Sequence, residues 1–104
     1  IEFSKVINLK NLISYQEAQV ISRTIAQTPA VSISLFSLDK GEGISTHVTP
    51  GDAMVQVLDG EAEITIGNNI FNVKAGETII MPSNVPHGLE ARVRFQMLLT
   101  VIKN

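Results

Sequence analysis

The amino-acid sequence predicts an all-β domain, a sandwich or barrel built from short strands. From residue 31 onward, apolar and polar residues alternate with the two-residue period of a strand that buries one face, as in Val31, Ile33 and Leu35. Turn-forming residues then divide the chain into short segments at regular intervals, which is typical of sandwiches and barrels. The 104 residues are 44% hydrophobic and 17% charged, which gives enough apolar surface for one core in a chain too short for two.

The beginning of the chain has the weakest pattern. Residues 16–26 fit the period of a strand and the period of a helix equally poorly, so an edge strand and a short helix are both open, and we prefer the strand. The strand that starts at Val31 is expected to end before Lys40-Gly41-Glu42-Gly43, where glycines interrupt the alternation.

Two tight turns are expected to separate the next three strands. Asp59-Gly60 lies between residues 54–58 and 61–66, and an Asp-Gly pair readily adopts the positive φ angles of a hairpin turn. Gly67-Asn68-Asn69 offers a second turn before residues 70–73. The sequence therefore predicts two consecutive hairpins in the middle of the chain.

The last two strands differ in how clearly they alternate. Residues 77–81 are predicted to form a strand that ends at Pro82, because proline cannot donate a ladder hydrogen bond. Residues 92–102 alternate most clearly, with one apolar face and one mostly polar face. Leu98 and Ile102 interrupt the polar face. A wholly solvated face would not normally carry them, so we expect this face to pack against a second subunit.

Composition excludes several classes of function. Eight Lys and Arg residues against ten Asp and Glu give a net charge of -2, which argues against nucleic acid as a partner. The absence of cysteine excludes disulfides, thiolate metal sites and a cysteine nucleophile. No apolar run approaches the roughly 20 residues that cross a bilayer, so no membrane association is expected. The first residues lack the order of a signal peptide, which favours a cytoplasmic location.

The two histidines of the chain, His47 and His87, are the strongest candidates for chemistry. Both are expected at strand ends beside turn residues, and Pro86 stiffens the approach to His87. A glycine-containing hairpin separates the two segments, so they can pair as neighbours and direct both imidazoles inward. Acid–base chemistry by these groups would need a substrate that the sequence does not identify.

The spacing of these residues resembles the two motifs of the cupin superfamily. The first motif is represented here by Gly41, His47, Thr49, Ala53 and Gly60. The second motif is represented by Gly76, Pro82, His87 and Ala91. The resemblance spans residues 31–103 and implies a double-stranded β-helix, or jelly-roll, barrel. It implies one cupin domain over residues 1–104, with an N-terminal segment and edge strand in 1–30 and the barrel in 31–104, and a homodimer.

The resemblance also implies a metal site that this chain has only in part. Cupin metal sites use three histidines and one glutamate, and Thr49 and Ala53 occupy the places of the second histidine and the glutamate. His47 and His87 remain as ligands for a divalent metal, and Zn, Fe, Ni, Mn and Cu are not distinguished. Asp52 is expected to cap the turn at Pro50-Gly51, and it reaches the site only if a bulge turns its side chain inward.

The predicted function is therefore the binding of an unidentified small molecule inside the barrel. The expected pocket contains His47, Thr49, Met81 and His87, and we predict that most of the barrel interior is apolar. One alternative is a metal-dependent cupin enzyme, such as a dioxygenase, isomerase or decarboxylase. Another is a non-catalytic structural or regulatory dimer. The sequence does not decide whether the protein is an enzyme.

Overall fold

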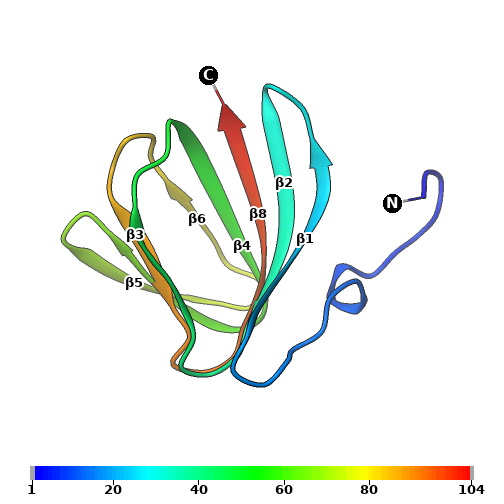
Figure 1. Ribbon diagram of the computed structural model, residues 1–104, viewed down its shortest axis with the longest axis horizontal. Coiled ribbons are helices and arrows are strands. Elements are labelled where there is room, and N and C mark those ends of the chain that lie inside the picture. Colours follow the sequence, from blue (N-terminus) through cyan, green and yellow to red (C-terminus); the bar gives the residue numbers. More distant parts are fainter. Residues whose placement is uncertain (1, 104) are drawn as a thin grey trace.

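A computed structural model describes residues 2–103 as eight β-strands and one short 3-10 helix (Figure 1). The elements in chain order are η1 (Leu9–Asn11), β1 (Val20–Gln27), β2 (Val31–Leu38), β3 (Gly43–His47), β4 (Gly51–Ile66), β5 (Asn69–Lys74), β6 (Thr78–Met81), β7 (His87–Glu90) and β8 (Phe95–Lys103). Within residues 2–103, no helix has the length and apolar character needed to cross a membrane.

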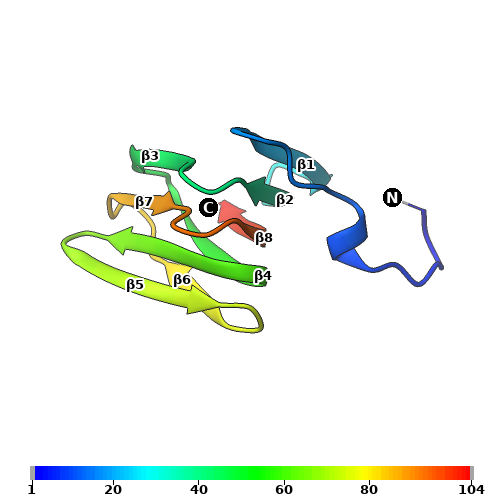
Figure 2. The ribbon, with the colours of Figure 1, turned by 90° about the horizontal axis from the view of Figure 1, so that it is seen from below.

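The strands form two facing sheets that share the long strand β4 (Figures 1 and 2). The first part of β4 pairs with β6 and β8, and β2 and β1 follow β8; we call this sheet A. The last part of β4 pairs with β5 and β7, and β3 follows β7; we call this sheet B. All pairs are antiparallel. The prediction of an all-β double-stranded β-helix is confirmed.

The predicted hairpin at Asp59-Gly60 is wrong. Strand β4 runs through both residues, and Asp59 and Gly60 lie opposite Gln96 and Phe95 of β8. A register shift between Val57 and Asp59 marks a bulge, and bulges bend a strand without reversing it. The positive φ of Gly60, +75°, therefore serves a bend by which β4 passes from one sheet to the other.

Most of the other predicted strand boundaries are confirmed. Residues 16–26 contain most of β1, so the preference for an edge strand over a helix is confirmed. The turn after Ile66 is a two-residue hairpin, with Ile66 opposite Asn69. Strand β6 ends at Met81, directly before Pro82, as expected. The final strand starts at Phe95 rather than at residue 92.

The core lies between the two sheets and is built from their alternating inward side chains. The predicted apolar face of β8 supplies Phe95 and Met97, which are fully buried. The other buried residues of this core cluster are Leu38, Ala53, Val55, Val57, Ala62, Ile64, Val73, Met81, Leu89 and Ala91. Burial of a large apolar side chain stabilises the fold by about 1.5–3 kcal/mol.

A strap of residues 12–15 crosses part of the outer face of sheet A. The Oγ of Ser37 donates to the Ser14 carbonyl, and Nε2 of Gln96 donates to the Ile13 carbonyl. Ser37 and Gln96 consequently become 1% and 5% exposed. Gln96 lies on the mostly polar face predicted for the last strand, and its burial was not predictable because sequence periodicity does not reveal the strap.

Tyr15 fastens the end of the strap. Its hydroxyl donates to the Asp59 carboxylate at 2.6 Å, and the Arg94 guanidinium lies 4.5 Å from the centre of its ring. Burial, together with the neighbouring Asp59 carboxylate, raises the pKa of the Tyr15 hydroxyl above its ordinary value of 10.0. Tyr15 therefore stays protonated as a hydrogen-bond donor at neutral pH.

A Tyr15→Phe variant is expected to lower the free energy of unfolding by about 1 kcal/mol, since it removes one half-buried hydrogen bond to a carboxylate and keeps the ring under Arg94. Because the folded-state pKa is raised, the hydroxyl contributes fully below pH 10.0 and its contribution declines at more alkaline pH. Urea unfolding at pH 7 and above pH 10 measures both effects. Equal stability of the two proteins at neutral pH contradicts this role.

Candidate functional site

The two histidines meet where β3 and β7 pair. His47 and His87 are direct register partners, and their ring centroids are 4.4 Å apart with the ring planes at 68°. Ile44 and Leu89 also pair and contribute to the core, but His47 lies three positions after Ile44, an odd offset that in a regular strand puts the two side chains on opposite faces. The pairing register shifts between these two residues, which marks a β-bulge. The bulge returns the His47 side chain to the face of the sheet that carries the His87 ring. The predicted convergence of the imidazoles is confirmed.

Backbone contacts hold both rings in the same way. Nδ1 of His47 lies 2.8 Å from the Ser45 carbonyl, and Nδ1 of His87 lies 3.0 Å from the Val85 carbonyl. A carbonyl oxygen only accepts hydrogen bonds, so Nδ1 carries the proton in each neutral ring and Nε2 keeps a lone pair. The pair therefore presents two acceptor or ligand nitrogens. His87 is 3% exposed, whereas His47 is exposed to solvent.

A cavity of about 230 Å³ opens between the sheets beside these rings. Its walls are mostly apolar, and its lining residues are Val20, Phe36, Ile44, His47, Thr49, Ala53, Met81, His87, Leu89, Met97, Leu99 and Val101. All four residues of the predicted pocket, His47, Thr49, Met81 and His87, thus lie on one cavity; their role in binding stays a prediction. A cavity of about 150 Å³ accommodates benzene, so this one has room for a ring with a small substituent.

Thr49 carries the one unsatisfied polar atom found among the buried side chains of residues 2–103. Its Oγ1 is shielded from solvent and has no hydrogen-bond partner. Leaving a buried hydroxyl unpaired costs about 1–3 kcal/mol, so native proteins rarely do so without a further partner for that group. Together with the two imidazoles, Thr49 forms the polar part of the otherwise apolar cavity lining.

Long-range hydrogen bonds position the loop that leads into His87. The Asp52 carboxylate accepts from the backbone N–H of Ser83 at 2.8 Å, and the N–H of Asn84 donates to the Thr49 carbonyl at 2.9 Å. The expectation that Asp52 caps the turn at Pro50-Gly51 is wrong, because its carboxylate instead accepts from a backbone amide of a distant loop. Asp52 pairs with Ile102 on the outer face of sheet A and does not line the cavity.

The donor set does not fit the metal site of three histidines and one glutamate that the cupin resemblance implies. Thr49 and Ala53 do line the cavity with His47 and His87, so the four positions correspond. They supply two imidazoles, one hydroxyl and no carboxylate. Across residues 2–103, no three His, Asp or Glu side chains cluster closely enough to hold an ion. A divalent ion would bring uncompensated charge into an apolar cavity, which is strongly unfavourable.

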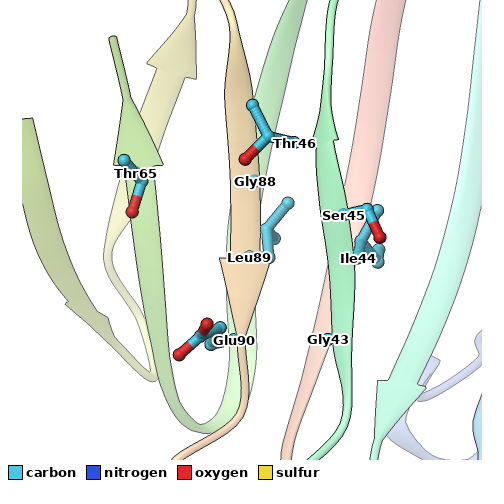
Figure 3. Close-up of a pocket in the computed structure, with 8 residues that line it drawn as sticks. All are labelled: Gly43, Ile44, Ser45, Thr46, Thr65, Gly88, Leu89 and Glu90. Atoms are coloured by element: carbon cyan, nitrogen blue, oxygen red, sulfur yellow. The ribbon is translucent and has the colours of Figure 1, made fainter. Parts of the chain in front are cut away.

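A larger hollow, of about 430 Å³, lies on the outer face of sheet B (Figure 3). It spans β3, β7 and the end of β4, where Gly43 and Gly88 lack side chains and Thr46, Thr65 and Glu90 surround the gap. The hollow is open to solvent, so water competes for each of its polar groups. The barrel cavity is the better candidate because two imidazoles and Thr49 line it among mostly apolar residues.

Part of this site was not predictable from the sequence. Val20 and Ile44 line the cavity, yet β1 had too weak a pattern to assign its faces, and no strand was assigned around Ile44. The inward face predicted for the last strand does supply Met97, Leu99 and Val101.

Comparisons with known proteins agree with the geometry. The family described as Cupin domain matches residues 34–102. No functionally curated protein matches the chain. A conserved protein of unknown function from Streptococcus pyogenes is 47% identical, with a TM-score of 0.96, over 100% of this chain and 91% of its own.

Two further solved structures are similar to the chain. A cupin superfamily protein from Desulfitobacterium hafniense is 31% identical with a TM-score of 0.94, over 100% of this chain and 95% of its own. A cupin 2 conserved barrel domain protein from Leptotrichia buccalis is 39% identical with a TM-score of 0.92, over 93% of this chain and 47% of that longer one. The matched family covers more than half of the sequence, and these structures share the fold over nearly all of it: the chain belongs to the cupin family.

Proposed function

We propose that the chain binds a small, mostly apolar molecule in the barrel cavity and that His47, Thr49 and His87 hold the polar group of that molecule. The observation that carries this proposal is the buried, unpartnered Oγ1 of Thr49 on an otherwise apolar wall. A ligand group that bonds this oxygen removes a penalty that the free protein bears.

The acceptors of the site restrict the polar group of the ligand. In the neutral rings both Nε2 atoms accept hydrogen bonds, because each Nδ1 proton is directed to a backbone carbonyl. A ligand hydroxyl or primary amide donates to these nitrogens and also has an oxygen for the Thr49 hydroxyl. The apolar remainder of the molecule then contacts side chains such as Phe36, Met81 and Leu99.

The enzyme alternative receives less support from the site. A metal-dependent cupin reaction needs a held ion, and the donor set supplies half of the usual ligands. We therefore propose binding, without a chemical step.

A thermal-shift series tests the proposal with compounds of one size. Benzyl alcohol and benzamide carry the required polar group, and toluene has the same ring without it. The two polar compounds are expected to raise the melting temperature more than toluene, since a ligand stabilises the native state by mass action. The proposal fails if no compound of this size changes the melting temperature, or if toluene is as effective as the others.

A Thr49→Val variant separates binding from folding. Removing the unpartnered hydroxyl is expected to leave the free protein as stable as the wild type, or more stable by about 1 kcal/mol, and to weaken binding of benzyl alcohol about tenfold. Thr65→Val is the matched control, because Thr65 lies on the outer face of sheet B. Denaturant unfolding and calorimetric titration measure the two effects. A loss of stability with unchanged affinity would assign Thr49 a structural role.

A further inference from the structure

The barrel cavity is long and narrow. Its wall on sheet A is made of four successive inward rows, where a row is a set of inward side chains that lie opposite one another on neighbouring strands. From one end to the other, the rows supply Ala53, Met81 and Val101, then Leu99, then Met97 and Phe36, and finally Val20. Successive rows are two residues apart on a strand, so the four rows extend over about 20 Å. A volume of about 230 Å³ spread over this length is a narrow channel.

The polar groups of this channel are gathered at one end. His47 and His87 pair with each other, and His87 also pairs with the last residue of β4. Thr49 lies two residues before β4 begins, beyond the first row. The N–H of Asn84 donates to the Thr49 carbonyl, which ties this segment to the loop before His87. A ligand whose polar head is held at this end must place the rest of its length along the apolar rows.

Val20 bounds the far end of the channel. Its side chain is 37% exposed, and the next inward residue of β1, Ser22, does not line the cavity. Two hydrogen bonds fix the backbone before Val20: the N–H of Ala18 donates to the Asp39 carboxylate at 2.8 Å, and the N–H of Asp39 donates to the Gln19 carbonyl at 3.2 Å. The channel therefore has an apolar end wall at a defined distance from its polar groups.

This end wall comes from a different part of the chain than the rest of the cavity. Strand β1 lies at the edge of sheet A, beside β2 (Figure 1). Val20 lies outside residues 34–102, which match the family, whereas the other lining residues lie inside that range. The matched region supplies the polar end and most of the apolar wall, and the segment before it supplies the limit of the channel.

We infer that the ligand is a linear molecule with an unbranched alkyl tail, and that Val20 is the specificity-determining residue that limits the length of this tail. The inference rests on the proposed function, since it takes the polar head to be held by His47, Thr49 and His87. Each methylene that the channel buries should tighten binding about fourfold. Once the tail reaches Val20, further methylenes emerge into water and add nothing.

The first experiment measures the affinity of the wild-type chain for 1-alkanols from 1-butanol to 1-nonanol by calorimetric titration. Affinity is expected to rise about fourfold with each methylene and then to level off. Cyclohexylmethanol has as many carbons as 1-heptanol and also one hydroxyl, and the linear alcohol should bind more tightly. Preference for the ring, or a gain that never levels off, overturns the inference while the proposed function stands. If neither an alkanol nor benzyl alcohol binds, both have failed.

The second experiment moves the end wall. In Val20→Phe the affinity should level off at a shorter tail, so the longest alkanols bind about tenfold more weakly and 1-butanol binds as to the wild type. Val20→Leu should shift the limit less, and it provides the test if the larger side chain prevents folding. General destabilisation would weaken short and long alkanols alike.

Val93→Phe is the matched control for this variant. Val93 is 49% exposed and does not line the cavity, so the same substitution there should reproduce the wild-type series. Folded Val20→Phe and Val20→Leu proteins that keep the wild-type limit overturn the inference, and so does an equal shift in the control.

Discussion

A double variant with Thr49→His and Ala53→Glu is expected to bind Zn²⁺ or Ni²⁺ about a thousandfold more tightly than the wild-type chain, or better. Both positions line the cavity beside His47 and His87, so the new side chains complete a set of three imidazoles and one carboxylate. The carboxylate also compensates part of the charge of the ion, which the present donor set cannot do. Competition with a chromogenic chelator measures the affinity of both proteins.

Two controls test whether the gain in affinity depends on the native histidines and whether position 53 accepts a larger side chain. His87→Ala added to the double variant should abolish most of the gain in metal affinity, because it removes one of the four ligands, a buried one. Ala53→Leu alone tests whether the buried position of Ala53, 2% exposed, tolerates a larger side chain. Circular dichroism establishes that each variant is folded. A folded double variant whose affinity equals that of the wild type contradicts the correspondence of the four positions.

The fold was largely predictable because strand faces are encoded locally. Alternation in residues 95–101 correctly identified inward side chains, and Pro82 correctly marked the end of a strand. In residues 31–36 the alternation predicted the wrong face: Val31, Ile33 and Leu35 lie on the outer face of sheet A, and Phe36 faces the cavity, because a strap that covers part of the outer face leaves apolar residues on both sides of the strand. The error at Asp59-Gly60 has a physical cause: the same positive φ angle serves a hairpin turn and a bulge. Only the pairing partner on β8 decides between them, and that partner lies about 35 residues farther along the chain.

The site was predictable to a similar extent. The resemblance to the cupin motifs correctly predicted that His47, Thr49, Met81 and His87 lie on one cavity. The bulge before His47 and the hydrogen bond from Ser83 to Asp52 were not predictable, since neither has a local sequence pattern. The burial of Gln96 likewise depends on the Ile13 carbonyl, a contact between opposite ends of the sequence.

Replacement of Gly60 by alanine is expected to destabilise the fold by about 2–5 kcal/mol. An alanine at a φ of +75° costs about 1–2 kcal/mol, because its Cβ approaches the local backbone. The same Cβ would also collide with the Arg94 carbonyl oxygen and lie 3.0 Å from the Cα of Phe95. Both atoms belong to the backbone, so β8 must shift, and such overpacking costs about a further 1–3 kcal/mol.

Gly76→Ala separates the two contributions. Gly76 also has a positive φ, +88°, but an added Cβ there meets no atom within 4 Å, so its cost should stay near 1–2 kcal/mol. Domains of this size are stable by about 5–15 kcal/mol, so Gly60→Ala should lose a large part of the folding free energy and Gly76→Ala a small part. Urea unfolding measures both. Equal losses of stability would mean that the positive φ alone accounts for the cost of replacing Gly60. The bend in β4 would then tolerate a side chain against β8.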